Sequence, residues 1–596
     1  MADLRSLSKD LVAKALNELL TEKNIEFPVI AGSAVSAETP PSPDMGDIGF
    51  PLFQYAKAFK MAPPLIAKEI AKKIESYAEA SSTGSFFTAG PYLNVKLQKA
   101  AAVGSVLAKI LEQGSAYGSF NEKNEYPLKE RRVMLEFSSP NTNKPLHLGH
   151  LRNDALGESV SRILKKLGAE VFKINNINNR GVHICKSMLA YQKFHEKNND
   201  TPESMGIKSD RFVGDCYVEF NNYSKENPQA EAEAQNLLVE WEKGNPEVHA
   251  VWQKMNDWAL NGVKLTYKRT GISFDKYYFE SDTYLKGKEE ILSGLEKGLF
   301  YREDDGSVWV DLEEIKLDKK VLLRKDGTAL YMTQDIGTAI FRHDDWAFNQ
   351  LVYVVGSEQI YHFKVLFYIL KKLGYDWADR LYHLSYGMVN LPEGKMKSRE
   401  GTVVDADDLI DSLRDGALEE IREKGREEAV GDAKDVAEKV ALGALHYFLL
   451  QVSPTKDMIF NPKESLSFNG NTGPYLQYMG ARISSIVRKA EEEGLVNPEH
   501  TANFSLLTNE AEWALIKQLE TFPLILEKAG ADLDPSGVVS YAYELAKLFS
   551  RFYHDCPILA AGSKELSCAR LELAKAVKTV LQTAMNIILV PFLETM

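Results

Sequence analysis

The order strand, helix, strand limits the fold of this chain more than any other feature. Residues 133–137 read VMLEF, an apolar run, and residues 171–177 form a second strand-like run. The helical pattern of residues 150–167 lies between them. A single helix that joins two buried strands returns the chain to the same end of the sheet, so the strands pair in parallel. We therefore predict an α/β fold with a Rossmann-like parallel-sheet domain.

The pattern along the rest of the chain sets the expected domain boundaries. At 596 residues the chain exceeds the size of one core. Further elements are expected as helices at 65–74 and 361–372 and as strands at 92–97, 307–310, 351–355 and 382–389, with a hairpin turn at Asp326-Gly327. The predicted domains are an N-terminal α/β unit (1–118), a sheet domain (127–420) with a polar, helical insertion at about 190–290, and an α-helical bundle (421–596).

Composition and charge give little information about binding partners, but they give some about the cellular compartment. The net charge of -13 argues only mildly against nucleic acid, because phosphate binding needs a local basic face. The N-terminus lacks an apolar signal core, and the apolar patch at 587–590 is too short to span a bilayer. The cysteines have neither a disulfide nor a zinc spacing, so we expect a cytoplasmic protein with no membrane partner and no protein-ligated metal. They are Cys185, Cys216, Cys556 and Cys568.

A stretch suited to phosphate follows the first strand. Residues 136–150 read EFSSPNTNKPLHLGH, so a polar loop leads into a helix that begins at the two histidines. The N-terminus of a helix offers free N–H groups to a phosphate, and Gly149 permits close approach of a nucleotide. His147 and His150 can donate hydrogen bonds to phosphoryl oxygens as charge develops there. Incidental histidines or a metal-binding pair are the alternatives, but the preceding strand and loop favour phosphate.

This stretch resembles the class I aminoacyl-tRNA synthetases, whose signature is His-Ile-Gly-His, and specifically the arginyl-tRNA synthetases. The arginyl family has a Ser-Pro-Asn-x-x-Lys-x-x-His-x-Gly-His pattern, which Ser139 to His150 match. The resemblance extends over most of the chain. It implies an arginine–tRNA ligase that uses ATP with Mg²⁺ and L-arginine to form arginyl-adenylate, and that then charges tRNA(Arg). It also implies an N-terminal domain that touches the tRNA D-loop and a C-terminal anticodon-binding bundle. We expect a monomer.

The second class I signature is a Lys-Met-Ser-Lys-Ser loop that clamps the phosphates of ATP. Residues 394–401 read GKMKSREG, one residue short of that pattern, and Lys397-Ser398 match its second half. Part of the charge could come from Lys395, Arg399 or the upstream Lys144. The residues implied for catalysis are His147, His150, Lys144, Lys395 and Lys397. Those implied for ATP binding are His147, Gly149, His150, Gly356, His362, Met388, Val389, Lys397 and Ser398.

The amino acid that the site can bind depends on the carboxylate side chains that the site contains. Glu136 lies in an apolar run, where an unpaired charge is expensive, so we expect a cationic partner for it. Tyr331 and Asp335 are four residues apart and share a face if helical. The resemblance implies that these two hold the guanidinium, and that the other end of arginine is held by Glu136, Asn141 and Gln359. The alternatives are a core Tyr331 and a helix-start charge at Asp335. His362, one turn beyond Gln359, could approach adenine or be an ordinary core histidine.

One position departs from the family pattern. Residues 175–181 read NNINNRG and resemble a strand-end motif that usually carries an aspartate where Asn179 stands. A charge-based role is therefore in doubt there, whereas a hydrogen-bonding or turn role remains.

Residues for tRNA are suggested by aromatic spacing. Aromatic rings near arginines can stack on unpaired bases, although such stripes are more often core. The candidates in the bundle are Tyr475, Tyr478, Phe549 and Tyr553, and those in the N-terminal unit are Tyr92 and Asn94.

Two rival functions follow from the same residues. A nucleotidyltransferase with a smaller substrate can share the His-x-Gly-His pattern, but the two flanking domains count against it. A synthetase-like RNA-binding protein without catalysis would be expected to lose residues such as His147, Glu136 and Asp335, which are all present.

Overall fold

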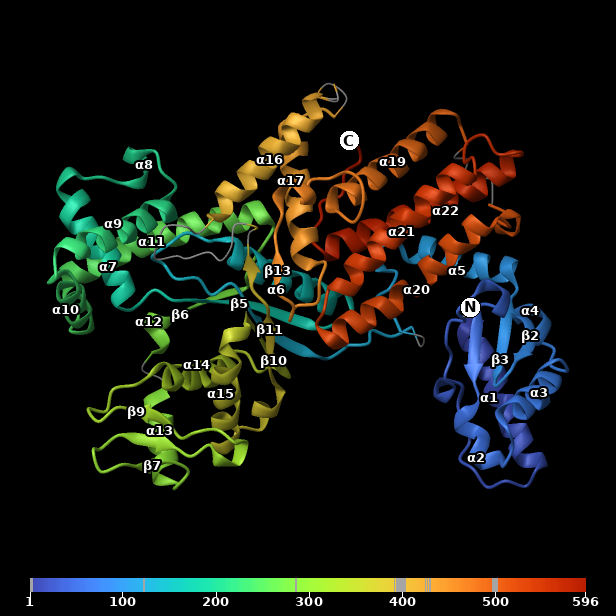
Figure 1. The fold of residues 1–596 in the computed structure, drawn as a ribbon, viewed down its shortest axis with the longest axis horizontal. Coiled ribbons are helices and arrows are strands. Elements are labelled where there is room, and N and C mark those ends of the chain that lie inside the picture. Colours follow the sequence, from blue (N-terminus) through green and yellow to red (C-terminus); the bar gives the residue numbers. More distant parts are fainter. Residues whose placement is uncertain are drawn as a thin grey trace. The chain divides into compact units, whose positions relative to one another are not determined.

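The computed structural model describes residues 4–121, 124–284, 287–390, 392, 404–423, 425, 427, 430–495 and 502–596 (Figure 1). The chain divides into two compact units, each of which is built from separate stretches of sequence. The first unit consists of residues 1–125, 482–524 and 544–583, and the second of residues 126–481, 525–543 and 584–596.

The N-terminal part of the first unit is a small antiparallel sheet with helices. The sheet has the order β1-β3-β2, and the predicted strand at 92–97 is its central strand. Helix α3 covers the sheet with Ile66, Ile70 and Ile74, which are fully buried at the helical spacing that the sequence predicts. The elements are α1 (Leu4–Glu22), β1 (Ile48–Pro51), α2 (Ala56–Phe59), α3 (Pro63–Ile74), α4 (Ala80–Thr83), β2 (Gly84–Ala89), β3 (Tyr92–Leu97) and α5 (Lys99–Gln113).

A five-stranded sheet forms the centre of the second unit. Every neighbouring pair in the order β11-β10-β4-β5-β6 is parallel, as the strand–helix–strand pattern predicts. The middle strand β4 is buried without alternation at Val133, Met134 and Leu135, as expected for a strand covered on both faces. The strands are β4 (Arg132–Glu136), β5 (Glu170–Ile177), β6 (Lys276–Phe279), β10 (Gln350–Gly356) and β11 (Leu381–Tyr386).

The chain reverses its direction of travel across the sheet beside β4. After β4, helix α6 (Leu148–Lys166) leads to β5 and β6 on one side, whereas β10 and β11 follow on the other side. Ligands of such sheets bind where the strand order reverses, at the carboxyl ends of the strands. Helix α6 spans this point, because the Asn153 amide donates to the carbonyl of Val354 in β10 at 2.7 Å.

Two predicted boundaries differ from the structure. Residues 382–389 belong to two strands, because the chain turns toward residues 454–457: Gly387 N donates to Pro454 O at 2.9 Å and Met388 N to Asp457 Oδ1 at 2.7 Å. The two-residue strand β12 (Val389–Asn390) then pairs with β13 (Met458–Ile459). The insertion ends earlier than predicted, because β6 already belongs to the parallel sheet.

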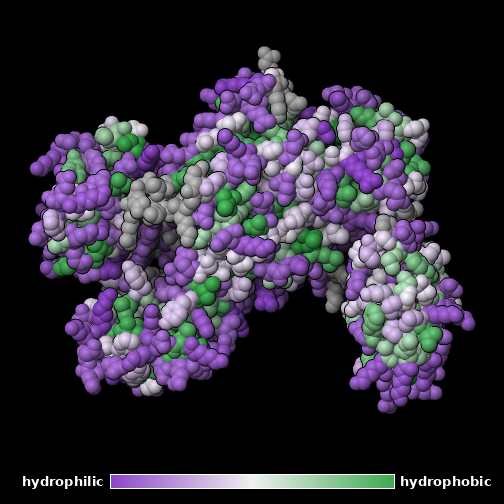
Figure 2. All heavy atoms as spheres, in the orientation of Figure 1, coloured by the Kyte–Doolittle hydropathy of each residue, from purple (hydrophilic) through white to green (hydrophobic). Residues whose placement is uncertain are grey.

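The insertion is helical, as predicted. Its aromatic and apolar residues form one buried cluster, whereas its surface in the view of Figure 2 is mostly hydrophilic. A π-helical turn, Tyr191–His195, follows directly after α7. The helices are α7 (Val182–Ala190), α8 (Pro202–Met205), α9 (Ser209–Glu226), α10 (Ala230–Glu242) and α11 (Pro246–Thr270).

The elements between β6 and β11 pack on the sheet. The predicted hairpin turn is present, with Gly327 at φ 76° and a hydrogen bond from its N–H to Arg324 O. The elements are α12 (Glu280–Thr283), α13 (Gly287–Glu296), β7 (Tyr301–Arg302), β8 (Val308–Val310), β9 (Lys320–Leu323), α14 (Tyr331–Asp345) and α15 (Ile360–Lys372). One core joins Met134 of β4 and Ile174 of β5 to residues of α13, β8, β9, α14 and α15.

The remaining long elements are helices, as the pattern beyond residue 420 predicts. The four helices after residue 472 each contribute residues to both compact units. In the described part of the chain, no helix has the length and apolarity needed to cross a membrane. The helices are α16 (Ala406–Glu423), α17 (Ala433–Leu450), α18 (Pro462–Ser465), α19 (Gly473–Glu492), α20 (Glu510–Asp532), α21 (Ser536–Asp555) and α22 (Lys564–Ile587).

Candidate active site at the carboxyl edge of the parallel sheet

The two signature histidines cap the first turn of α6. His147 is the N-cap residue, and its Nδ1 accepts a hydrogen bond from Gly149 N at 3.1 Å. The Nδ1 atom of His150 accepts one from His147 N at 3.2 Å, and the two ring centroids are 3.9 Å apart. Each ring therefore satisfies a backbone donor that the helix itself leaves unpaired.

The same hydrogen bonds fix the protonation of the rings. Burial lowers the pKa of His147 to about 4, with a further contribution from the Lys144 ammonium. Burial also lowers the pKa of His150 well below its usual value, and the His147 and Lys144 charges act in the same direction. A neutral ring whose Nδ1 accepts a hydrogen bond carries its proton on Nε2. Both rings thus keep an Nε2–H donor for a phosphate, next to the N-terminus of α6.

A strained loop joins β4 to α6. Ser138 and Ser139 have φ values of 72° and 49°, in the left-handed region that serines seldom adopt. Hydrogen bonds hold both residues, since Ser138 N donates to Asn153 Oδ1 at 2.5 Å and Ser139 N to Asn175 Oδ1 at 3.1 Å. Tyr267 OH lies 2.6 Å from Ser138 Oγ. Strain held by the surrounding structure is typical of functional loops.

A cavity of about 510 Å³ lies beside His147. The loop contributes Asn141 and Lys144 to its wall, and α9 of the insertion contributes Arg211 and Tyr217. Burial lowers the pKa of Lys144. The cavity therefore brings Lys144 next to the N-terminus of α6, whereas Arg211 is paired with Asp408, and Asp215 and Asp405 also line the wall.

The second signature, residues 394–401, lies outside the described residues, which resume at residue 404. Lys395, Lys397 and Ser398 fall in that gap. After residue 392 the described chain resumes beside the first signature, where Asp405 forms a β-bridge with His147 and Ala406 N donates to Leu146 O at 2.9 Å.

Glu136 has the cationic partner that its buried position predicts. Its Oε2 lies 2.5 Å from Arg342 Nη1 of α14, and its Oε1 accepts a hydrogen bond from Ser139 Oγ at 3.1 Å. The Arg342 side chain is only 2% exposed. Glu136 is thus paired within the protein, and its remaining capacity for a ligand is smaller than the sequence suggests.

The predicted guanidinium pair lies on α14. Tyr331 begins the helix and is 70% exposed, so it is not a core residue, and Asp335 follows one turn later. Asp335 Oδ2 lies 2.6 Å from His362 Nε2 of α15. His362, for which the sequence leaves an approach to adenine and a core position open, therefore contacts the carboxylate of the predicted arginine site. The histidine orients that carboxylate and leaves its other oxygen for a ligand.

A further carboxylate follows β6. Burial raises the pKa of Glu280 to about 7, the Arg180 guanidinium lowers it, and the Asp335 carboxylate raises it. Glu280 opens helix α12, which packs against α14. No local pattern singled out Glu280, because its place at the sheet edge follows only from the register of β6.

Other predicted ligand residues lie at strand ends. Gly356 is the last residue of β10. Gln359 lies in the turn that follows this strand, and its side chain is exposed. Met388, after β11, is 48% exposed, whereas Val389 is buried. Asn141, after β4, is bridged to Asn178 at the end of β5.

Asn179 has the hydrogen-bonding role that its amide permits. It is buried, its Nδ2 donates to Ser281 Oγ at 3.0 Å, and its Oδ1 accepts from Ser281 N at 3.0 Å. An ionised aspartate has no donor to offer in return. The amide therefore joins the ends of β5 and β6 without adding a negative charge beside Glu280.

The predicted tRNA-binding residues of the first unit differ in exposure. Tyr553 is 43% exposed and lies under the Arg482 guanidinium, 5.2 Å from ring centroid to Cζ. Phe549 is completely buried, so its ring belongs to the core and cannot stack on a base. Asn94 is also buried and donates to Met45 O at 2.7 Å, which leaves the half-buried Tyr92 as the accessible member of that pair.

In the second unit, Tyr475 and Tyr478 lie one turn apart on α19 and are both half-buried. The Tyr475 ring lies 5.7 Å from that of Tyr543. Tyr478 lines a cavity of about 250 Å³ together with Phe468 and Met596.

Comparisons with known proteins agree along the whole chain. Residues 109–462 match the family "tRNA synthetases class I (R), catalytic domain", residues 476–596 the "DALR anticodon binding domain" and residues 6–97 the "Arginyl tRNA synthetase N terminal domain". The chain is 62% identical to the arginine–tRNA ligase of Treponema denticola, with 100% of both chains covered. It is 46% identical to that of Borrelia hermsii, over 99% of this chain and 98% of the relative. The structure of arginyl-tRNA synthetase from Thermus thermophilus has a TM-score of 0.76 at 24% identity and covers 99% of this chain and 100% of its own.

Proposed function

The chain belongs to the class I arginyl-tRNA synthetases and is an arginine–tRNA ligase, and we propose that its active site is the carboxyl edge of the sheet around β4 and β10. One observation carries this proposal: the capped N-terminus of α6 opens at the place where the strand order reverses. The ligand residues expected from the sequence follow the ends of the adjoining strands.

On the phosphate side, ATP binds along the first turn of α6. The Nε2–H groups of His147 and His150 donate to phosphoryl oxygens, and Lys144 adds a positive charge from the cavity wall. Lys395, Lys397 and Ser398 act on the same phosphates, which the return of the chain beside His147 supports. Magnesium accompanies ATP and neutralises part of its charge.

On the arginine side, α14 and α12 supply the negative charge. Asp335, held by His362, accepts from the guanidinium, and Tyr331 covers it. Glu280 is a second carboxylate for the same cation, since its pKa already responds to Asp335. Asn141 and Gln359 hold the α-amino and carboxylate end of arginine. Glu136 acts mainly through its ion pair with Arg342.

The reaction then needs positioning and charge neutralisation and no protein nucleophile. A carboxylate oxygen of arginine attacks the α-phosphorus of ATP, the bond to the β-phosphate oxygen breaks, and pyrophosphate leaves. The neutral histidines donate to the oxygens on which charge increases. In the second step a hydroxyl of the terminal adenosine of tRNA(Arg) attacks the arginyl carbonyl, and AMP leaves.

The remaining features concern the whole enzyme. The aromatic residues Tyr475, Tyr478 and Tyr553 contact the tRNA anticodon region, and Tyr92 the D-loop. The enzyme works as a monomer in the cytoplasm. Bound tRNA precedes activation of the amino acid.

Arginine-dependent exchange of pyrophosphate into ATP, measured with and without tRNA, tests the activity. We expect exchange with arginine alone among the amino acids, and only when tRNA is present. Exchange with another amino acid, or none under either condition, would refute the assignment.

Two variants test the site. Asp335→Asn should raise the KM for arginine more than about tenfold with little change in the KM for ATP, because one charge-assisted hydrogen bond is lost. His150→Ala should lower kcat by about 100-fold. The exposed Asp344→Asn on α14 is the matched control and should behave as the wild type. Equal effects on both KM values in Asp335→Asn would contradict the proposed division of the site.

A further inference from the structure

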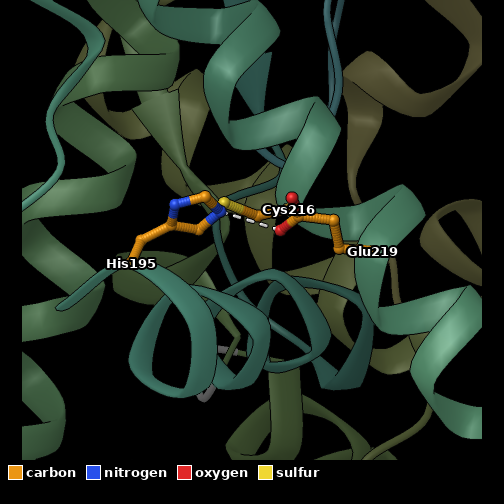
Figure 3. Close-up of side chains that lie close together, drawn as sticks. All are labelled: His195, Cys216 and Glu219. Atoms are coloured by element: carbon orange, nitrogen blue, oxygen red, sulfur yellow. Dashed lines mark hydrogen bonds and ion pairs between the residues drawn. The ribbon is translucent and has the colours of Figure 1, made fainter. Parts of the chain in front are cut away.

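A histidine, a cysteine and a glutamate converge inside the insertion. One ligand atom from each of His195, Cys216 and Glu219 lies within 4.8 Å of the other two. Figure 3 shows the imidazole pointing toward the thiol and the carboxylate from the opposite element. Cys216 and Glu219 are one turn apart on α9, so they share a face of that helix.

The local backbone presents His195 from the other side. It is the last residue of the π-helical turn Tyr191–His195, which follows directly after α7. The edge of its ring packs against Phe212 of α9, with centroids 5.2 Å apart. The imidazole therefore has a defined position relative to α9.

Burial is graded across the three side chains. Cys216 is completely buried in the aromatic core of the insertion, the His195 side chain is 13% exposed and that of Glu219 is 40% exposed. The thiol thus forms the floor of the cluster and the carboxylate its solvent side. An ion could enter past Glu219 without disturbing the core.

A second carboxylate orients the histidine from behind. Asp200 Oδ2 lies 3.0 Å from His195 Nδ1, whereas His195 Nε2 lies 2.9 Å from Glu219 Oε2. A carboxylate on the far nitrogen is the usual companion of a metal-bound histidine, because it fixes the tautomer and the ring orientation. With the proton of the neutral ring on Nδ1, Nε2 is available as a ligand.

From this arrangement we propose that His195, Cys216 and Glu219 form a zinc site in the insertion. Nitrogen, sulfur and oxygen ligands together suit Zn²⁺, whereas Mg²⁺ and Ca²⁺ prefer oxygen alone. With Zn–S near about 2.3 Å and Zn–N near about 2.0 Å, tetrahedral ligands are roughly 3–4 Å apart, so small side-chain rotations suffice. Three protein ligands leave a fourth position for water.

The site has a mechanical consequence for α9. The residues Gly214, Asp215, Tyr217 and Val218 of this helix line the cavity beside His147. A metal that joins the π-helical turn to Cys216 and Glu219 holds the same stretch of helix in place. Cysteine spacing alone does not reveal the site, because the fold supplies ligands from two separate segments.

Cobalt titration of the full-length protein tests the proposal. After treatment with a chelator, Co²⁺ should bind with one equivalent per chain and give the near-ultraviolet thiolate band and the visible bands of tetrahedral cobalt. Zn²⁺ should displace it and raise the thermal unfolding temperature. Cys216→Ser should abolish the thiolate band, whereas Cys185→Ser should leave it unchanged, since Cys185 is buried in the same cluster but outside the proposed ligand set.

Variants at the solvent side keep the test independent of core folding. Glu219→Gln and His195→Gln should weaken cobalt binding by at least about tenfold, and Asp200→Asn should weaken it roughly 10–100-fold while the thiolate band remains. Absence of the band in the wild type, or a band that survives Cys216→Ser, would overturn the proposal. The cluster would then be an imidazolium held between Asp200 and Glu219.

Discussion

At the scale of single residues, charged side chains of the second unit are held by partners from distant parts of the chain. Buried Glu136 requires a cation, and the structure supplies Arg342 from a helix 206 positions later in the chain. His362, for which the sequence leaves an approach to adenine and a core position open, contacts Asp335. Glu280 carries no sequence signal at all. Partners that come from distant segments depend on the register of the sheet, which local patterns do not fix.

Glu280 makes arginine binding sensitive to pH. Its pKa of about 7 means that it is largely protonated at about pH 6 and ionised at about pH 8, and only the ionised form attracts a guanidinium. We expect the KM for arginine to fall as the pH rises through this range. Glu280→Gln should raise the KM at the alkaline end and remove this pH dependence, as measured by pyrophosphate exchange. The exposed Glu289→Gln on α13 is the control, and an unchanged pH profile in Glu280→Gln would exclude the role.

Asp154 makes the stability of the second unit depend on pH. Burial raises its pKa to about 8, far above the value in an unfolded chain. A raised carboxyl pKa means that the folded state binds more protons between about pH 4 and 8, so stability is greatest at the acid end and falls as pH rises. Asp154→Asn should remove up to about 1.4 kcal/mol per pH unit from that slope.

Urea unfolding at about pH 5.5 and about pH 7.5 measures this difference. The Asp154→Asn variant should gain stability relative to the wild type at the higher pH, whereas Asp344→Asn should not. If the free energy of unfolding changed with pH by the same amount in Asp154→Asn and in the wild type, Asp154 would be ionised over the whole range.

At the scale of elements, long periodic segments are predictable and interruptions are not. Strands β4, β5, β10 and β11 and helix α6 lie within a few residues of their predicted positions, because apolar periodicity and helix-start residues lie in the local sequence. Strand β6 was not predicted and falls inside the predicted insertion. The break at Gly387 and the π-helical turn before Glu196 were missed. Contacts with residues 454–457 cause the first, because tertiary packing overrides local preference there.

The ion pair between β4 and α14 should be essential to their packing. Arg342→Met leaves Glu136 charged, buried and without its cation, which costs about 3–5 kcal/mol. Urea unfolding should show this loss, and Glu136→Gln combined with Arg342→Met should recover much of it. Arg302→Met at an exposed position is the control. A loss in the double variant as large as in Arg342→Met would mean that the charge is not the cause.

At the scale of the whole molecule, residues near the C-terminus complete a hydrophobic core whose other members lie in α16 and α17. Leu593 is buried in a cluster with Ile421 of α16 and with Val436 and Val440 of α17. The His446 ring lies 2.9 Å from Leu589 O, and Gln477 donates to Pro591 O at 3.0 Å. The C-terminal segment is therefore part of the second unit.

Leu593→Ala should destabilise the second unit by about 2–5 kcal/mol, as for other buried leucines. Thermal unfolding should show the loss, whereas Leu524→Ala, at a position that is 47% exposed, should have little effect. Equal unfolding temperatures for Leu593→Ala and the wild type would show that the segment is dispensable.

The division of the chain between two units has a consequence for its synthesis. Residues 544–583 belong to the first unit and residues 584–596 to the second, so each needs sequence from the far end of the chain. A ribosome adds roughly 5–20 residues per second, and domains made of one continuous stretch fold as they emerge. Neither unit of this chain can finish folding as it emerges, because part of each unit is synthesised last. A protein that supplies translation with arginyl-tRNA thus acquires its own finished structure only after nearly all of its translation is over.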